Sequence, residues 1–174
     1  RVPDDRPAGR HGVTAPAGFR ASGLHCGIKA SGKPDLALLV SGLPAYAAGL
    51  FTTNLAKAAP VLVSQEHLLA ADGQARAIVT NSGCANACTG PQGLSDAREM
   101  AQLTAAAVGC PPEQVLVAST GVIGVNLKMD RLREGIPHDL EGDAADLDVH
   151  LDRGDAVLRP RDFEVHVAEM ILVA

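Results

Sequence analysis

Apolar residues in the first two thirds of the chain occur mostly in short runs bounded by glycine, proline and small polar residues. Runs of roughly four to eight such residues, with valine and isoleucine among them, are typical of β-strands. The predicted strands are residues 36–40, 46–53, 61–64, 77–79 and 115–119. The first is apolar throughout, so we expect both of its faces to be covered. The short links after it favour antiparallel neighbours.

Between residues 89 and 109 the apolar residues recur at the spacing of an α-helix and no longer in short runs. Thr89 and Gln92 have the spacing of a capping box, Pro91 falls in the first turn, and Gly109 follows the last turn. The residues expected on its core-facing stripe recur at spacings of three and four: Leu94, Ala97, Ala101, Ala105 and Val108. Shorter helices are predicted at residues 65–71, ending near Gly73, and at residues 128–134, stopped by Gly135 and Pro137.

The pattern changes after Pro137. Residues 138–146 are acidic and lack a period, whereas residues 147–152 and 163–167 alternate as half-buried strands do. The apolar residues 170–174 are expected to pair in a sheet or to pack on another chain. The sequence therefore predicts three parts: a flexible arm at residues 1–12, a mixed α/β domain at residues 13–136 and an atypical tail at residues 137–174.

Composition narrows the class of protein. Apolar residues make up 47% of the 174 residues but aromatic residues only 2%, so the core must be built from alanine, valine, leucine and isoleucine. The net charge of −5, without a basic stripe interleaved with aromatic residues, argues against nucleic-acid binding. No apolar stretch reaches the roughly 18 residues of a membrane span, and no signal peptide is recognised. We therefore expect a cytoplasmic protein that does not bind membranes.

Cysteine and glycine patterns give little support for a metal or a nucleotide. The four cysteines have irregular spacings, and Cys84 and Cys88 form a C-x3-C pair without a second pair of ligands. Free thiols in a reducing compartment are the better interpretation for Cys26, Cys84, Cys88 and Cys110. Residues 27–34 have the glycine and lysine spacing of a phosphate-binding loop, but Pro34 stands where that loop needs serine or threonine.

The stretches most suited to chemistry follow two predicted strands. They are residues 81–90 and residues 119–124, the latter containing Ser119, Thr120 and Gly121. Small residues at strand ends leave room for a ligand and let backbone N–H groups approach it. The N-terminus of the following helix would favour an anion or a developing negative oxygen nearby. Two tight turns and ordinary helix capping explain the same composition equally well.

A nucleophile is harder to place within the chain. No set of serine, histidine and aspartate stands out. His25 lies beside Cys26, while His138 and His150 belong to the atypical tail. Cys26 or Cys88 with a histidine base is conceivable, but lone cysteines in apolar surroundings are usually structural.

Seven segments follow one another as they do in ornithine acetyltransferases, also called bifunctional glutamate N-acetyltransferases, the self-cleaving acyltransferases of arginine biosynthesis. The segments are residues 13–23, 27–29, 34–38, 48–54, 57–61, 81–90 and 119–124. The resemblance is collinear from about residue 13 to residue 136. It makes this part similar to the α chain of such an acyltransferase.

The resemblance implies a layered α/β sandwich of mixed β-sheet and helices, like that of self-processed N-terminal-nucleophile enzymes. It implies transfer of acetyl from N-acetylornithine to glutamate through an acyl-threonine, with Thr120 and Gly121 as the oxyanion hole. The threonine would be the first residue of a partner β chain, giving an α/β heteromer. No cofactor and no metal are implied, although acetyl-CoA could serve as a substrate.

The chain departs from the family pattern where the nucleophile should arise. It has no alanine–threonine junction near its end, and the Thr-Thr-Asp and Lys-Gly segments expected after Ile136 are missing. We therefore expect this chain alone to be inactive. A non-catalytic remnant that binds a partner or a small ligand, and a self-cleaving peptidase of the same architecture, stay open as alternatives. Lys29, Lys57 and residues 81–89 could position a carboxylate-bearing substrate, or could be solvated or capping groups.

Overall fold

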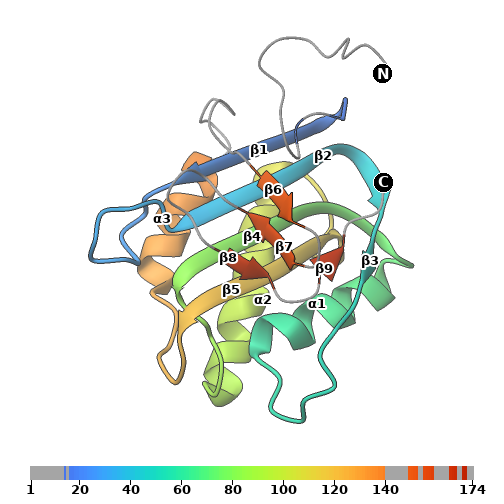
Figure 1. Ribbon diagram of the computed structural model, residues 1–174. Coiled ribbons are helices and arrows are strands. Elements are labelled where there is room, and N and C mark those ends of the chain that lie inside the picture. The colour runs from blue at the N-terminus through green and yellow to red at the C-terminus, as the bar shows by residue number, and fades with distance from the viewer. Residues whose placement is uncertain are drawn as a thin grey trace.

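The computed structural model describes residue 14, residues 16–139 and the backbone of residues 149–152, 155–158, 165–167 and 170–171. Figure 1 shows a four-stranded sheet with helices on one side and a small three-stranded sheet in front of the other. This arrangement confirms the predicted layered α/β class. The predicted arm at residues 1–12 lies outside the described residues, and the division at residue 136 stays a prediction.

The main sheet places the two glycine-containing stretches side by side. Its order is β1 (Phe19–Leu24), β2 (Leu36–Tyr46), β4 (Gln74–Cys84) and β5 (Val115–Val122). The first three strands are antiparallel to their neighbours, whereas β4 and β5 are parallel. A parallel pair needs a crossover connection, which α2 (Gly90–Val108) and the short helix η2 (Pro112–Gln114) supply. The carboxyl ends of β4 and β5 therefore meet at the same edge.

The core lies between the sheet and three helices, α1 (Ala59–Ala70), α2 and α3 (Met129–Asp139). Alternate residues of the strands enter it, among them Leu36, Leu38, Val40, Val79, Val115 and Val117. The predicted α2 stripe is confirmed at its centre, where Ala97, Ala101 and Ala105 are buried. Because these side chains are small, α2 can lie close to the sheet without the aromatic residues that the chain lacks.

Shorter strands complete the fold beside the second face of the sheet. β3 (Ala48–Gly49) pairs with β9 (Met170–Ile171), as expected for the apolar stretch at residues 170–174. The strands β6 (Val149–Asp152), β7 (Asp155–Leu158) and β8 (Val165–Val167) form an antiparallel sheet. β8 lies beside β5, in front of the main sheet in Figure 1.

Two predicted strands are wrong. Residues 61–64 belong to α1, which begins two residues earlier at Ala59, with Pro60 in its first turn where a missing N–H costs least. Residues 46–53 do not form one strand: Tyr46 is the last residue of β2, and only Ala48–Gly49 follows as the short strand β3. Local bonds compete with strand pairing here: Asn54 N–H donates to Thr52 Oγ1 at 3.2 Å, and the Asn54 side chain accepts from Ala56 N–H at 2.9 Å.

Helix ends differ from prediction in two places. Thr89 does not cap α2, because its hydroxyl donates to Asn86 Oδ1 at 2.7 Å, and Gln92 bonds Asp96 instead of closing a capping box. Gly109 does end α2, in the left-handed conformation with φ 74°. α3 continues through Gly135 to Asp139. Gly135 is needed there for close packing, since a Cβ would lie 2.6 Å from Cys26 Cβ.

The outer edge of β5 is covered by side chains of α1 in place of another strand. Ser64 Oγ donates to the carbonyl of Val117 and accepts the Val117 N–H, both at 2.8 Å. His67 Nδ1 lies 2.8 Å from the carbonyl of Val115. Both side chains are buried, so these bonds satisfy backbone groups that water cannot reach.

Replacing Ser64 by alanine should destabilise the protein. The Val117 N–H would be left buried without an acceptor, which costs about 1–3 kcal/mol of the free energy of unfolding. Urea denaturation followed by circular dichroism measures the loss. Ser95, an exposed serine on α2, is the matched control, and its alanine variant should stay within about 0.5 kcal/mol of the parent. Equal stability of both variants would contradict a role for Ser64 at the strand edge.

Candidate functional site

The predicted site residues lie where β4 and β5 end. In the parallel register Ser82 is paired with Thr120, and Gly83 with Gly121. Gly121 has φ +133°, a conformation that L side chains rarely adopt, and a Cβ there would overlap the carbonyl carbon of Gly83. Glycine is therefore required at residue 121 both for its backbone conformation and for its close approach to β4.

The segment that follows Gly121 is held against the loop after β4. Ala85 N–H donates to the carbonyl of Val122 at 2.9 Å, and Gly124 N–H donates to the carbonyl of Ala87 at 2.8 Å. The buried Cys84 thiol adds a contact of 2.9 Å to the carbonyl of Val125. These contacts fix residues 120–124 before any substrate is present. Thr120 and Gly121 belong to the end of β5, a turn follows at residues 123–124, and the whole segment 120–124 is called the turn below.

The turn itself is accessible. Thr120 is half-buried and Gly121 is exposed. The next two residues are apolar and open to solvent, Val122 being 59% and Ile123 65% exposed. A small substrate could therefore reach the turn, as an oxyanion hole requires. The assignment of the oxyanion hole to Thr120 and Gly121 stays a prediction.

Asp35 connects a third segment to this site. Its buried carboxylate accepts hydrogen bonds from the backbone N–H groups of Cys26 at 2.7 Å and Lys29 at 2.8 Å. Its backbone carbonyl accepts the Ser82 N–H at 2.8 Å. Residues 26–29 consequently pack on the end of β4, where a Cβ on Gly83 would lie 3.1 Å from Lys29 Cγ. Gly83 is thus enclosed between this loop and Gly121.

Burial raises the pKa of Asp35, but hydrogen bonds from the Lys29 and Cys26 N–H groups outweigh burial and hold that pKa below its ordinary value. His25, with Nδ1 3.1 Å from the carboxylate, acts in the same direction. Asp35 is therefore a carboxylate at neutral pH, and the loop at residues 26–29 depends on that charge.

The side chains of the two lysines raised by the sequence are engaged elsewhere. Lys29 Nζ donates to the carbonyl of Pro34 at 3.2 Å, and Lys57 Nζ lies 3.5 Å from Gln65 Oε1. The four cysteines are free thiols. Burial, followed by the hydrogen bond to Asp35, raises the pKa of the Cys26 thiol to about 12. A thiol that stays protonated is a poor nucleophile, so Cys26 does not fit that role.

Two residues that shape the site were missed by the sequence reasoning, Asp35 and Asn86. Asn86 is buried at φ 47°, accepts the Thr89 hydroxyl, and donates from Nδ2 to the carbonyl of Gly93 at 2.8 Å. Asparagine tolerates the left-handed region, so its place in a glycine-rich loop was the available signal. For Asp35 the signal was an acidic residue directly before an apolar strand.

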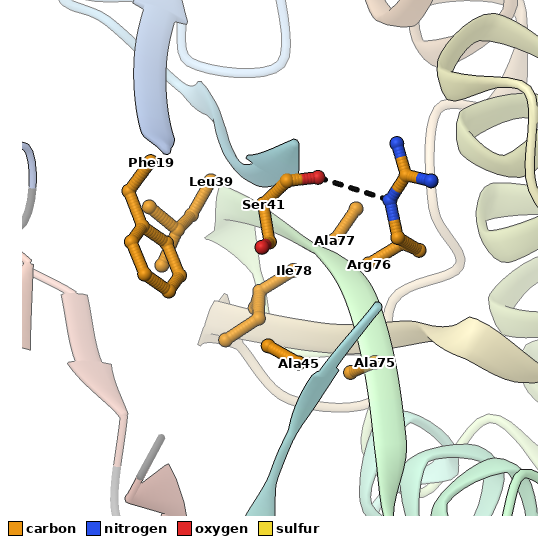
Figure 2. Close-up of a pocket in the computed structure, with 8 residues that line it drawn as sticks. All are labelled: Phe19, Leu39, Ser41, Ala45, Ala75, Arg76, Ala77 and Ile78. Carbon is orange, nitrogen blue, oxygen red and sulfur yellow. Dashed lines mark hydrogen bonds between the residues drawn. The ribbon is translucent and has the colours of Figure 1, made fainter. Parts of the chain in front are cut away.

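A separate hollow lies at an irregularity in β2 and is mainly apolar. Its lining is Phe19, Leu39, Ser41, Ala45, Ala75, Arg76, Ala77 and Ile78, as Figure 2 shows. Arg76 Nε donates to the carbonyl of Ser41 at 2.9 Å across the shift in register between Val40 and Ala45. Neither Thr120 nor Gly121 lines it, and its residues do not supply a nucleophile with a base. It is therefore not the predicted acyl-transfer site.

Among known protein families, residues 20–159 match the ArgJ family. The chain belongs to the ArgJ family. The arginine biosynthesis bifunctional protein ArgJ of Symbiobacterium thermophilum is 57% identical over 127 residues, which are 72% of this chain and 31% of that protein. ArgJ 1 of Nostoc is 54% identical over 126 residues, 72% of this chain and 30% of that protein. The match thus spans about a third of the length of these relatives.

Solved structures of the family share the fold. The ornithine acetyltransferase of Mycobacterium tuberculosis complexed with ornithine has a TM-score of 0.71 at 49% identity, covering 76% of this chain and 70% of that chain. ArgJ of Bacillus halodurans has a TM-score of 0.67 at 44% identity, covering 70% and 62% respectively. Within the described residues, none of the helices combines the length and apolarity that a membrane crossing requires.

Replacing Asp35 by asparagine should change how stability depends on pH. A carboxylate with a lowered pKa stabilises the folded state above its ordinary pKa of 3.8, and this contribution is lost as the pH falls through the lower folded value. We expect the free energy of unfolding of the parent to fall in acid more steeply than that of Asp35→Asn. Urea titrations between about pH 2 and pH 7 measure both slopes. If the free energy of unfolding depended on pH in the same way in both proteins, the stabilising role of the Asp35 carboxylate would be contradicted.

Proposed function

We propose that this chain is the α-chain-like part of an acyltransferase that moves acetyl from N-acetylornithine to glutamate. The observation that carries the proposal is the turn at Thr120 and Gly121, accessible to solvent and fixed against Gly83, in a chain of the ArgJ family. The ornithine bound to the M. tuberculosis relative supports an ornithine derivative as substrate. We also propose that this reaction takes place in the cytoplasm.

In the proposed reaction a threonine of a partner β chain supplies the nucleophile. Its hydroxyl oxygen attacks the acetyl carbonyl of N-acetylornithine, and its own α-amino group takes the proton. The carbonyl oxygen becomes negative, and the Thr120 hydroxyl and Gly121 N–H donate hydrogen bonds to it. The C–N bond then breaks, ornithine leaves with the proton on its amine, and the acetyl group stays on threonine. The glutamate amine attacks this ester, which returns the threonine and releases N-acetylglutamate.

The direct test uses the chain produced together with a threonine-starting family segment. Transfer of labelled acetyl from N-acetylornithine to glutamate, with both polypeptides retained in one assembly by mass spectrometry, is the expected result. Cleavage of peptides instead of acetyl transfer would support the peptidase alternative. An assembly that binds ornithine without turnover would support the non-catalytic remnant.

Replacing Thr120 by alanine in the active assembly should lower kcat by about 10²- to 10³-fold, the usual cost of losing one donor to an oxyanion. Thr120→Ser keeps the hydroxyl and should retain most of the activity. Ser95→Ala on the exposed face of α2 is the control for handling and folding. A Thr120→Ala assembly with the parental kcat would remove Thr120 from the oxyanion hole.

A further inference from the structure

Two buried polar atoms directly before the turn lack hydrogen-bond partners. Asn81 is fully buried, and its Nδ2 donates to the carbonyl of Cys84 at 2.9 Å, which fixes the orientation of the amide. The other end of that amide, Oδ1, is without a partner, and so is the buried Oγ of Ser119. A buried polar atom without a hydrogen-bond partner destabilises the folded protein, so a neighbouring pair of such atoms indicates a binding site for a small molecule.

The two side chains are neighbours on one face of the sheet. Asn81 and Ser119 are paired in the parallel register of β4 and β5, and side chains at paired positions project from the same face of a sheet. That face is the one covered by the helices, because Val79 and Val117, two residues earlier on each strand, lie in the core. Thr80 Oγ1, another buried atom without a partner among the described residues, belongs to the opposite face and so is not part of this pair.

The chemistry of the pair suits one small molecule that both donates and accepts. Asn81 Oδ1 can only accept a hydrogen bond, whereas the Ser119 hydroxyl can donate as well as accept. A water molecule that donates to Asn81 and accepts from Ser119 satisfies both atoms, and buried waters typically join such groups. A cation would fit less well, since neither residue is charged.

We propose that Asn81 and Ser119 hold one ordered water between β4 and β5 and are positioning residues for Thr120 and Gly121. Asn81 also bonds the carbonyl of Cys84, the last residue of β4, so the water joins the end of β4 to the residue before Thr120. Loss of this water would allow the spacing of β4 and β5 to change at the contact between Gly83 and Gly121. The catalytic part of this inference rests on the proposed acetyl transfer.

Threonine and valine have nearly the same shape, so these two variants at Ser119 separate the effect of the hydroxyl from the effect of side-chain shape. Ser119→Thr keeps the hydroxyl and Ser119→Val replaces it by a methyl group of similar size. In an assembly that transfers acetyl, we expect Ser119→Val to lower kcat about 10- to 100-fold relative to Ser119→Thr, with KM changed less than about twofold. Ser95→Ala, which removes an exposed hydroxyl of α2, is the control and should leave kcat within about threefold. Equal kcat for the valine and threonine variants would overturn the positioning role.

Two further measurements test whether Asn81 and Ser119 hold a water molecule, even if acetyl transfer is not found. A high-resolution crystal structure should show a solvent peak within hydrogen-bonding distance of both Asn81 Oδ1 and Ser119 Oγ. A direct bond between the two side chains, or no solvent between them, would overturn the proposal. In urea denaturation, the unfolding equilibrium constant of Ser119→Val should exceed that of Ser119→Thr by about tenfold. This difference should shrink to less than about twofold when Asn81 is alanine, and its persistence there would also overturn the proposal.

Discussion

The contact between Gly83 and Gly121 is the constraint on which the rest of the site depends. Neighbouring strands lie about 4.8 Å apart, and at this pair even a single Cβ on Gly121 would overlap the backbone of β4. The turn at Thr120 therefore has one available position relative to β4. Any element that sets the spacing of β4 and β5 consequently also sets the geometry of the turn.

Three elements set that spacing. α2 connects β4 to β5, and its buried alanines let it cross close to the sheet. α1 satisfies the outer edge of β5 through Ser64 and His67, so β5 is fixed on both of its edges. Asp35 orders the loop at residues 26–29 against Gly83 from the side of β2. The small, aromatic-poor core thus serves the site by allowing close approach.

The local sequence pattern was sufficient to predict the strands at residues 36–40, 77–79 and 115–119 and helix α2. In each of them the spacing of apolar residues and the flanking glycine or proline residues indicated the same element. The pattern failed at α1, where the apolar residues 61–63 fit a strand as well as a helix. The contacts that favour a helix there are distant: Ser64 and His67 bond residues 53 and 48 positions further along the chain. The role of Asp35 was hidden for the same reason, since its backbone carbonyl bonds Ser82 on another strand.

An oxyanion hole accelerates a reaction because its donors are fixed before charge develops, so they need no rearrangement in the transition state. In this chain the groups that fix the turn all belong to the described domain, whereas Val122, Ile123 and Val125 beside it are exposed and apolar. Exposed apolar side chains next to a rigid turn are suited to contact with another polypeptide segment. A nucleophile that must be freed at a new N-terminus cannot sit inside such a continuous strand. Placing it on a separate chain leaves the donors rigid, the attacking hydroxyl accessible and the α-amino base free, which is the arrangement proposed for this protein.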